Sequence, residues 1–474
     1  MITGKILKLN GWPDGKIIGL AKSVADQLEA DGFDRDSILA RLDSVRQNPG
    51  GFLADPLLAD LARECLRLAQ SHESKQDEAL RALPLQYRVW GEEHIDQEAL
   101  RQMDSAMRLP VSVVGALMPD AHVGYGLPIG GVLATDGVVI PYAVGVDIAC
   151  RMRLSIYEVS PHLIGQKPGQ FEKSLLEQTQ FGMGAEWKGS RRAEHAVLDD
   201  PAWEATRLLR SLQDNARRQL GTSGTGNHFV EWGAFSLKQD APEFGLSAGE
   251  YLALLSHSGS RSVGFKIADY YSKLAMEKHP GLDKSARHLS WLTLDSEEGQ
   301  EYWLSMELAG RFASANHYVI HHRVAAAAGL KELVVVENHH NFAWREKLPD
   351  GSNVIVHRKG ATPAGPGVLG VIPGSMGDAG YLVRGKGLAD SLNSASHGAG
   401  RQMSRKAAIH SITKTARDAY LRERGITLLG GGLDEAPQAY KPIESIIAAQ
   451  SDLVEIIGKF TPRLVRMADE PGDI

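Results

Sequence analysis

The chain has little cysteine: Cys65 and Cys150 are the two cysteines among its 474 residues. Two thiols cannot supply the disulfide framework of a small secreted domain, which favours a reducing compartment. No run of about 18 apolar residues occurs, and this argues against a transmembrane helix. The first residues also lack the apolar core of a signal peptide. These absences predict a cytoplasmic protein with no membrane segment.

The chain also lacks an excess of positive charge, because its formal net charge is −6. This balance argues against a general nucleic-acid coat, although a local basic groove is still compatible with it. The G-x-x-x-x-G-K-[ST] loop of common NTPases and the Rossmann fingerprint are both missing. Glycine is plentiful instead, with 50 residues, and many of them stand beside histidine, asparagine or serine. Glycine permits close approach of the backbone to a ligand, so these clusters are the candidate sites.

The first 84 residues predict a small unit without recognisable chemistry. A short strand is expected first, followed by helices whose apolar residues recur at helical spacing. Asp34 or Asp36 is the expected N-cap of the second helix, and Cys65 is expected in a helix core. A polar segment at 71–79 is typical of a linker.

The stretch PYAVGVDIACRM, residues 141–152, holds the first candidate ligands. Asp147 and Cys150 are three residues apart, so a carboxylate and a thiol can converge on one metal ion, or the thiolate can bridge two. This donor pair suits a borderline divalent ion better than magnesium alone. The alternative is that Cys150 is simply a small buried hydrophobe.

Histidines in similar settings favour the metal interpretation. GTSGTGNHFVEWG places His228 after a glycine loop, SHSGSR places His257 at the end of an apolar strand, and VVVENHHN does the same for His340. Four strands ending near 148, 228, 257 and 340 therefore predict a metal site beside a nucleotide site. Arg261 could grip a phosphate as a planar fork. His317 and His321 lie on a long helix at about 297–327 and are interpreted as structural.

A second glycine cluster surrounds His397 in SASHGAGRQMSRKAA. A helix is expected directly after the glycines, and a helix N-terminus binds anions through its unpaired N–H groups. The pattern therefore predicts that His397 is held against a phosphate. Asp120 and His122 end a buried strand upstream, where they are either site residues or part of a turn satisfied by its own side chains.

Nine motifs in this order resemble the RtcB-type RNA ligase family: MPDAHVGYGLPIGG, GVDIAC, GTGNHFVEWG, SHSGSR, HHNFAW, HRKGATPA, PGSMG, SHGAGRQMSRKAA and DEAPQAYK. The resemblance begins near Tyr87 and runs almost to the C-terminus. It implies an α+β fold with a large mixed-sheet catalytic domain over 85–474, behind a small, mainly helical extension over 1–84.

The resemblance also implies an activity. Two Mn²⁺ ions and GTP are expected to serve an RNA ligase that joins 3′-phosphate or 2′,3′-cyclic phosphate ends to 5′-hydroxyl ends through a guanylylated histidine. RNA and GTP are the expected partners. A monomeric state and an activating protein partner are further expectations.

The residues of this expected site follow by motif. Asp147 and His228 are implied to hold one manganese, His257 and His340 the other, with Cys150 bridging both. His397 is the implied nucleophile. The implied GTP site is lined by Asn227, His228, Phe229, Val230, Glu231, His340, Asn341, Pro373, Gly374, Ser375, Met376, His397, Gly398, Ala399 and Gly400.

Four features depart from the family pattern. Arg151 follows Cys150 where glycine is usual, Asp378 and Gly380 stand where relatives tend to carry threonine and a nucleotide-contacting serine, and the chain ends in PGDI instead of lysine-glycine. These differences predict looser guanine recognition, unless Arg463 or Arg466 replaces the lysine.

Two other functions stay open at this point. One is a metal phosphoesterase that opens cyclic phosphates without ligation, and the other is a non-catalytic RNA-binding module. The intact histidine loop and the complete ligand set favour the ligase.

Overall fold

The computed structural model describes residues 2–13, 16–66, 68 and 78–469. The chain divides into two compact units, Met1–Ala79 and Leu80–Ile474. Most of the segment predicted to be a linker, 71–79, lies outside the described residues. In the part of the chain that the structure describes, no helix combines the length and the apolar content needed to cross a membrane.

The smaller unit is helical. It contains α1 (Gly4–Leu9), α2 (Lys16–Ala30), α3 (Arg35–Gln47) and further helical residues at 59–66. The strand expected at its start is wrong, because Thr3 caps α1 by accepting a hydrogen bond from the Ile6 amide at 3.4 Å. Asp34 caps α3 through the Ser37 amide at 2.9 Å, and Cys65 is buried in the unit's apolar core, both as predicted.

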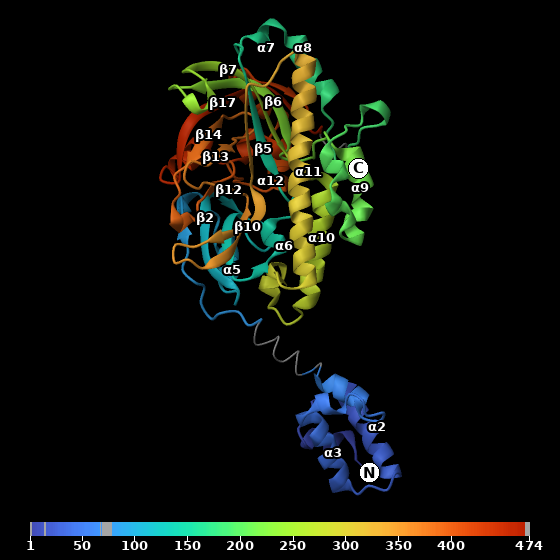
Figure 1. Ribbon diagram of the computed structural model, residues 1–474. Coiled ribbons are helices and arrows are strands. Elements are labelled where there is room, and N and C mark those ends of the chain that lie inside the picture. The colour runs from blue at the N-terminus through green and yellow to red at the C-terminus, as the bar shows by residue number, and fades with distance from the viewer. Residues whose placement is uncertain (1, 14–15, 67, 69–77, 470–474) are drawn as a thin grey trace. The chain divides into compact units, whose positions relative to one another are not determined.

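A large, mostly antiparallel sheet dominates the second unit (Figure 1). Its spatial order is β13 (Leu369–Ile372), β14 (Gly380–Gly385), β17 (Val454–Met467), β6 (Phe229–Leu237), β7 (Gly249–Ser258), β5 (Arg151–Tyr157) and β9 (Val334–His339), with β16 (Thr427–Leu429) paired to β17. Buried side chains such as Leu154, Leu254 and Trp232 alternate along these strands and pack against the helices. The α+β prediction with mixed sheets is confirmed.

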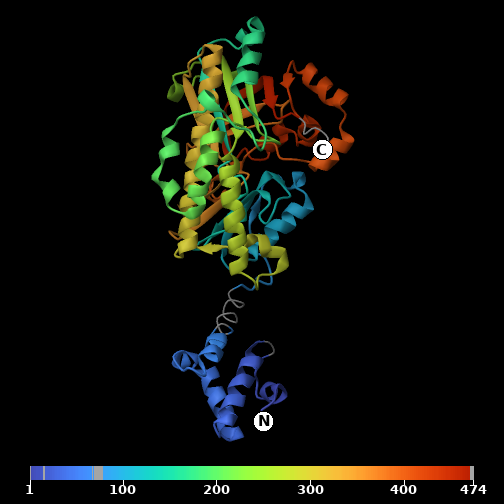
Figure 2. The ribbon, with the colours of Figure 1, turned by 90° about the vertical axis from the view of Figure 1, so that its right-hand side faces the viewer.

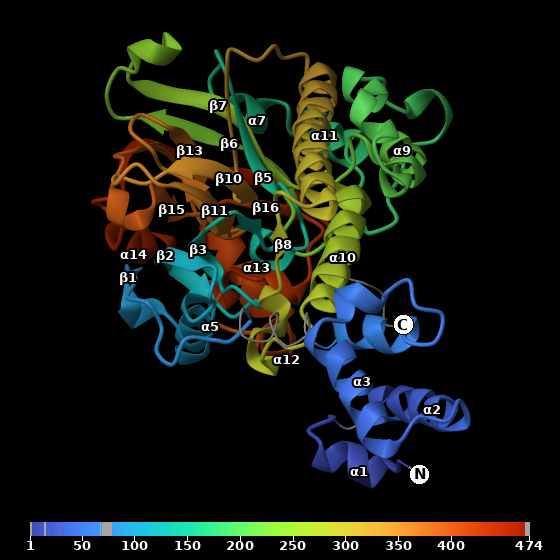
Figure 3. The ribbon, with the colours of Figure 1, turned by 60° about the horizontal axis from the view of Figure 1, so that its bottom comes forward.

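A smaller, five-stranded sheet lies next to one end of the large sheet (Figure 3). Its order is β1 (Arg88–Val89), β2 (Ser112–His122), β3 (Ile129–Thr135), β11 (Asn353–Lys359) and β10 (Asn341–Lys347). β9 of the large sheet continues into β10 of the small one, with His340 as the single residue between them. His340 therefore stands at the junction of the two sheets. Two short pairs complete the strands: β12 (Ala361–Pro363) with β15 (Ser394–Ser396), and β4 (Val138–Val139) with β8 (Leu292–Thr293).

Helices cover both sides of this unit. Figure 2 shows α10 and α11 on one side and the helices around 405–423 on the other. The helices of the unit are α5 (Gln97–Met107), α6 (Pro141–Val144), α7 (Leu163–Gln166), α8 (Pro168–Gln178), α9 (Arg207–Gln219), α10 (Arg261–Lys278), α11 (Glu297–Ala328), α12 (Arg405–Ser411), α13 (Lys414–Glu423) and α14 (Ile443–Ala448).

Two buried histidines of α11, His317 and His321, are structural, as the sequence analysis interpreted them. His317 Nδ1 and His321 Nε2 both hydrogen-bond the Ser256 hydroxyl, at 2.7 and 2.8 Å. His317 Nε2 donates to the carbonyl of Ser258 at 3.1 Å. Burial lowers the pKa of His317 to about 3, which keeps the ring neutral. The two rings therefore hold the end of β7, where His257 lies.

A buried ion cluster fastens β5 and β9 to each other and to α11. Arg151 Nη1 lies 2.6 Å from Glu337 Oε2, and Arg153 also pairs with Glu337. Ser314 on α11 donates a further hydrogen bond to Glu337 at 2.9 Å. Burial acts to raise the pKa of Glu337, but the two guanidinium groups outweigh it and hold that pKa below its ordinary value.

Removing this carboxylate should destabilise the larger unit. We expect Glu337→Gln to lower its free energy of unfolding by about 3 kcal/mol, because buried Arg151 loses its counter-charge and Arg153 keeps only Glu332, at 3.2 Å. A folded pKa below the unfolded one stabilises above about pH 4.3, and the contribution fades as the pH falls through the folded pKa. Denaturant unfolding at several pH values measures both effects. The exposed pair of Glu455 with Arg384 provides the control, since Glu455→Gln should change stability by less than about 1 kcal/mol.

Candidate metal and histidine site

The register of four neighbouring strands brings the predicted metal ligands together. Across the large sheet, Phe229 pairs with His257, Met152 pairs with His257, and Arg151 pairs with His339. Because these strands are antiparallel, the starts of β5 and β6 lie at the same edge as the ends of β7 and β9. Cys150 and His228 come directly before strands, not at strand ends as the sequence predicted. The predicted convergence is nevertheless present.

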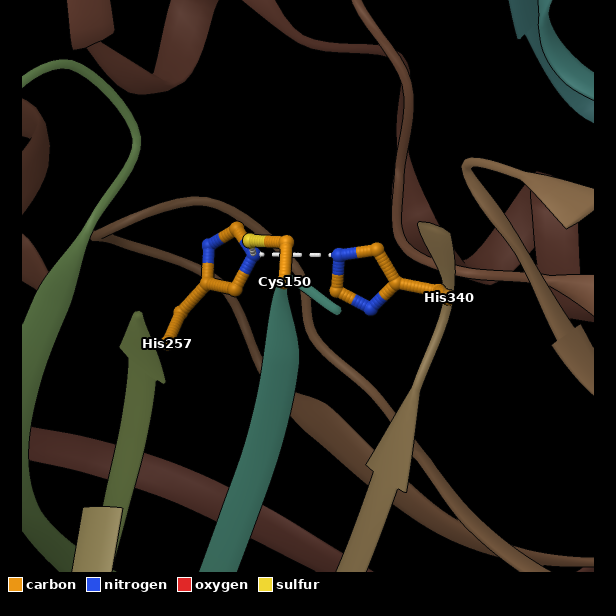
Figure 4. A group of neighbouring side chains, drawn as sticks. All are labelled: Cys150, His257 and His340. Carbon is orange, nitrogen blue, oxygen red and sulfur yellow. Dashed lines mark hydrogen bonds between the residues drawn. The ribbon is translucent and has the colours of Figure 1, made fainter. Parts of the chain in front are cut away.

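The donor atoms lie within a few ångströms of one another. Cys150 Sγ is 3.1 Å from His257 Nε2 and 3.5 Å from His228 Nε2, and His257 Nε2 is 3.2 Å from His340 Nε2. His228 Nε2 is also 3.0 Å from the carboxylate of Asp147. Figure 4 shows Cys150, His257 and His340 pointing toward one another from three different strands or their ends.

These five side chains form two groups that could each hold a metal ion. One group is Cys150, His257 and His340, and the other is Asp147, Cys150 and His228; within each group all ligand atoms lie within 4.8 Å of one another. Cys150 is the member that the groups share. This is the arrangement that a thiolate bridging two cations requires.

The loop that carries Asp147 and Cys150 is held by backbone contacts. Ala149 adopts a left-handed conformation with φ of 58°, and its amide donates to the carbonyl of Asn341 at 2.7 Å. The Asn341 side chain donates to the Asp147 carbonyl at 3.1 Å and accepts from the Gly360 amide at 2.8 Å. Asn341 thus stabilises the loop that carries Asp147 and Cys150. At Gly259 a Cβ would lie 2.1 Å from the Asp147 carboxylate, so only glycine leaves this carboxylate its place.

Burial and neighbouring charges shift the pKa values of these side chains. Burial raises the pKa of the Cys150 thiol well above its ordinary value, and the charge of Asp147 raises it further. Burial lowers the pKa of His257 and of His340 well below the ordinary value, so both imidazoles are neutral. His257 donates through Nδ1 to the Asn227 carbonyl at 3.0 Å, which leaves the lone pair of Nε2 facing the cluster. Neutral imidazoles, a carboxylate and a thiolate are the donors that a borderline divalent ion takes, and binding of a cation would displace the proton of the Cys150 thiol.

His397 lies beside this cluster and is oriented by Asp120. Its Nδ1 is 2.6 Å from Asp120 Oδ2, and the same oxygen accepts from the amides of His397 and Gly398 at 3.1 and 3.3 Å. The His397 ring centroid is 4.9 Å from that of His340. At Gly400, where φ is 73°, a Cβ would lie 2.1 Å from the Asp120 carbonyl, so the loop can close over Asp120 only with glycine there.

The helix expected directly after this loop starts later than predicted. α12 begins at Arg405 and is capped by Ser404, so its N-terminus is eight residues past His397. The interpretation of His397 as a residue at a helix N-terminus is therefore wrong. A carboxylate orients it instead, which the short glycine-rich motif did not reveal.

The predicted nucleotide-site residues lie around the same edge. Phe229 and Val230 start β6, and the Phe229 ring is 5.8 Å from that of His257. Glu231 is buried between Leu255 and Val465, without a hydrogen bond or ion pair to any described residue, and burial raises its pKa well above the ordinary value. Pro373 and Gly398 are adjacent, since a Cβ at Gly398 would lie 3.3 Å from the Pro373 carbonyl.

Sequence reasoning missed the roles of two residues and misassigned a third. Lys359 is buried, its pKa lowered to about 7 by burial, and it donates to the Leu127 carbonyl at 2.9 Å. Asp120 had been left open between a site role and a turn. Arg261 was expected to bind phosphate, but its guanidinium donates to Thr222 Oγ1 and to the Gly182 carbonyl at 3.0 and 2.6 Å. A buried carboxylate or lysine at a strand end is the signal that could have indicated the first two.

Comparison with known proteins identifies the family. Residues 102–468 match the family model described as tRNA-splicing ligase RtcB. The chain is 32% identical to the RNA-splicing ligase RtcB of Escherichia coli K12, over 77% of this chain and 92% of that protein. It is also 32% identical to the tRNA-splicing ligase RtcB of Methanococcus maripaludis, over 75% of this chain and 88% of that protein.

The chain belongs to the RtcB family. The resemblance inferred from the nine motifs is thereby confirmed. In this RtcB-family chain the departure at Arg151 is absorbed by the ion cluster, because the guanidinium turns toward Glu337 and the Gly310 carbonyl of α11.

The departures near the nucleotide-site loop have structural consequences. Asp378 accepts hydrogen bonds from the hydroxyls of Ser375 and Tyr420, the latter at 2.6 Å, so α13 is tied to the 373–376 loop. Gly380 pairs with Phe460 on β17 and offers no side chain. Arg466 lies opposite Val230, one residue from Glu231 in register, and donates to the Leu429 carbonyl at 2.7 Å and to Asp469 at 2.8 Å. Both of these hydrogen bonds come from its Nη1 atom.

The shared thiol gives a direct test of the two metal groups. We expect Cys150→Ser to weaken binding of divalent manganese at both groups, because a serine hydroxyl is a far poorer bridging ligand than a thiolate. Asp147→Ala should weaken one group preferentially, and Cys65→Ser, in the other unit, should change neither. Titration followed by calorimetry or by electron paramagnetic resonance measures this. Full two-site binding by Cys150→Ser would contradict the bridging arrangement.

Proposed function

We propose that this chain is a manganese-dependent RNA ligase that uses GTP to join RNA 3′-phosphate or 2′,3′-cyclic phosphate ends to 5′-hydroxyl ends. Its larger unit is the catalytic domain, and the predicted domain division at 84 and 85 is part of this proposal. RNA is the substrate that the RtcB family implies. The names of the similar proteins support ligation, and no feature of the described residues favours hydrolysis alone.

The observation that carries the proposal is the pairing of His397 with Asp120 beside the donor cluster. The Asp120 carboxylate can only accept, so the Nδ1 nitrogen of His397 carries the proton. The lone pair of Nε2 is then available for attack. An imidazole fixed in one tautomer by a carboxylate is a recurring means of activating a histidine.

Where the RNA end is a 2′,3′-cyclic phosphate, water first opens the ring, which breaks the bond to the 2′ oxygen and leaves a 3′-phosphate and a 2′-hydroxyl. His397 Nε2 attacks the α-phosphorus of GTP, a nitrogen–phosphorus bond forms, and pyrophosphate leaves with the electrons of the broken phosphorus–oxygen bond. An oxygen of the RNA 3′-phosphate then takes the guanylate and releases His397. The 5′-hydroxyl of the second strand attacks that activated phosphate and displaces GMP. Asp120 holds the His397 ring throughout and stabilises its positive charge while the guanylate is attached.

Two groups of side chains would hold the metal ions: His257 and His340 for one, Asp147 and His228 for the other, with Cys150 common to both. Divalent ions bound there would neutralise phosphate charge and align attacking and leaving groups. The predicted GTP site runs from Asn227–Glu231 to the loops 373–376 and 397–400. Buried Glu231, which has no hydrogen-bond or ion-pair partner among the described residues, is suited to the polar edge of the base.

One assay tests the whole proposal. The protein is incubated with Mn²⁺, labelled GTP and two RNA halves, one with a cyclic phosphate and the other with a 5′-hydroxyl. A joined RNA and a labelled protein are expected. Opening of the cyclic phosphate without joining and without protein labelling would instead identify a phosphoesterase, and binding without either reaction would identify a non-catalytic module.

The nucleophile is testable by itself. His397→Ala should still bind manganese and GTP but form no protein–GMP adduct, because the metal ligands and loop amides remain. Asp120→Asn should form the adduct at least about tenfold more slowly, since an amide no longer enforces the tautomer. The adduct should be acid-labile. Mass spectrometry that places the guanylate on Lys359 would contradict the assignment, and His322→Ala is the control because that ring lies outside the site.

Nucleotide choice should be looser than in relatives that carry a serine at the position of Gly380. Phosphate-binding groups cannot tell the bases apart, so selectivity depends on polar groups at the base edge. A missing hydrogen bond removes about 0.5–1.5 kcal/mol, so the loss of this one predicts a GTP preference lower by about two- to tenfold. Adduct formation with each triphosphate at equal concentration measures it. Labelling by GTP with no detectable labelling by ATP would show that another contact compensates.

A further inference from the structure

Three aromatic side chains that the proposed chemistry does not use form a cluster on the surface. Tyr125 is 67% exposed, and its ring centroid lies 6.0 Å from that of His288 at an interplanar angle of 82°. His288 is also exposed, and its ring lies 5.0 Å from that of half-buried Tyr142. We name Tyr125, Tyr142 and His288 the aromatic cluster. Because most of the Tyr125 side chain is exposed, it contributes little to the core, and its ring is open to a ligand.

Tyr125 is connected through the backbone to residues around His397. Tyr125 lies in the connection between β2 and β3, five residues after Asp120, the partner of His397. The side chain of Lys359 donates to the backbone carbonyls of Tyr125 and Leu127. The next residue, Gly360, is so close to His397 that a Cβ there would lie 3.2 Å from its Cε1 atom. The Tyr125 backbone is therefore positioned by the same strand end that borders His397.

Tyr142 and His288 lie on elements next to the segment that carries the candidate metal ligands Asp147 and Cys150. Tyr142 lies in α6, five residues before Asp147. The short helix η7 (Lys284–Leu289), which carries His288, packs against α6 and α10. Figure 1 shows α6 and α10 side by side. Tyr125 and Tyr142 thus lie on the segments that carry Asp120 and Asp147, each five residues away in sequence, and His288 on η7 joins them.

The elements around the cluster carry more basic than acidic residues. Lys266 on α10 and Lys284 and Arg287 on η7 are exposed, and none of them has an ion-pair partner among the described residues. Acids on the same elements offset only part of this charge: Asp269 pairs with Lys273 at 2.8 Å, Asp283 accepts from the Ser285 amide at 2.8 Å, and Glu277 is exposed on α10. This local excess of cations contrasts with the chain's net charge of −6.

We propose that the aromatic cluster stacks the bases of a single-stranded RNA end that enters the His397 site, while Lys266, Lys284 and Arg287 contact its phosphates. This inference rests on RNA being the substrate. Aromatic side chains recognise single strands because every base offers a π face, whereas the stacked bases of a duplex do not. Unpaired cations next to polar-tipped rings complement phosphates and bases. They would be out of place on a face built to dock an apolar protein surface.

The test measures RNA binding without GTP or manganese, so that it does not depend on ligation. A short single-stranded RNA with 2-aminopurine near its end is titrated with the full-length protein, following anisotropy and 2-aminopurine quenching. Tyr125→Ala should raise the Kd about tenfold and abolish the quenching, as expected for the loss of one stacking ring. Tyr125→Phe should keep both, because stacking needs the ring and not the hydroxyl.

Two further variants separate stacking from charge and from general damage. Lys284→Ala with Arg287→Ala should lower the salt dependence of binding, while Tyr125→Ala should leave that slope unchanged. Tyr318→Ala is the matched control. Tyr318 is 44% exposed and lies 5.7 and 5.8 Å from the rings of His195 and His322, on segments that carry no site residue. Its loss should leave the RNA Kd and the quenching unchanged.

The outcomes are distinguishable from a failure of the proposed function. Formation of the His397 adduct should be the same in Tyr125→Ala and in the wild type, since no RNA takes part in that step. An unchanged RNA Kd in Tyr125→Ala would overturn the stacking surface, as would an equal loss of affinity in Tyr318→Ala. An unchanged Kd is also the result expected if the cluster docks a protein. Quenching that depends on Tyr125 in a protein that never labels with GTP would support the surface and count against the ligase.

Discussion

Antiparallel hydrogen bonding among β6, β7, β5 and β9 is the constraint on which the site depends. These strands enter the sheet from alternate directions, so two strand starts and two strand ends share one edge. A slip of one residue in any of these pairings would turn a ligand to the other face of the sheet. The register is maintained from behind by α11, through the bonds of His317 and His321 to Ser256 and through the pairing of Arg151 with Glu337.

The metal-ligand candidates are gathered at this same end of the strands. Sγ of Cys150 and the Nε2 atoms of three histidines face one another in a buried space next to a carboxylate. Burial favours the neutral thiol and neutral imidazoles, and bound cations would favour the thiolate. Asp120 fixes the tautomer of His397, because its carboxylate accepts a hydrogen bond from Nδ1 of a ring that otherwise has two tautomers. The site thus combines ligand donors and a separately oriented nucleophile at the junction of two sheets.

Local patterns indicated much of this arrangement. The glycine loops, the apolar strands and the spacing of Asp147 and Cys150 indicated side chains that the fold brings together, and His317 and His321 are structural, as they were interpreted from the sequence. The first strand was wrong because Thr3 caps a helix whose Leu7 is buried against the rest of the small unit. The helix after His397 was placed too early because glycines before a helix look the same whether the helix starts at once or eight residues later. Arg261 was misassigned because its partners, Thr222 and Gly182, are distant in sequence.

The sequence by itself determined the chemical inventory: one thiol and one carboxylate three residues apart, histidines next to apolar strands, and a histidine among glycines. These choices depend on residue type and local spacing, which a linear chain displays directly. Only the tertiary structure decided how close the donor atoms lie, that Asp120 orients His397, that Arg466 bonds Leu429 and Asp469, and that Tyr125 meets His288 on the surface. Each of these pairs joins residues from separate elements, and their distances follow from strand register and helix packing, which local sequence does not encode.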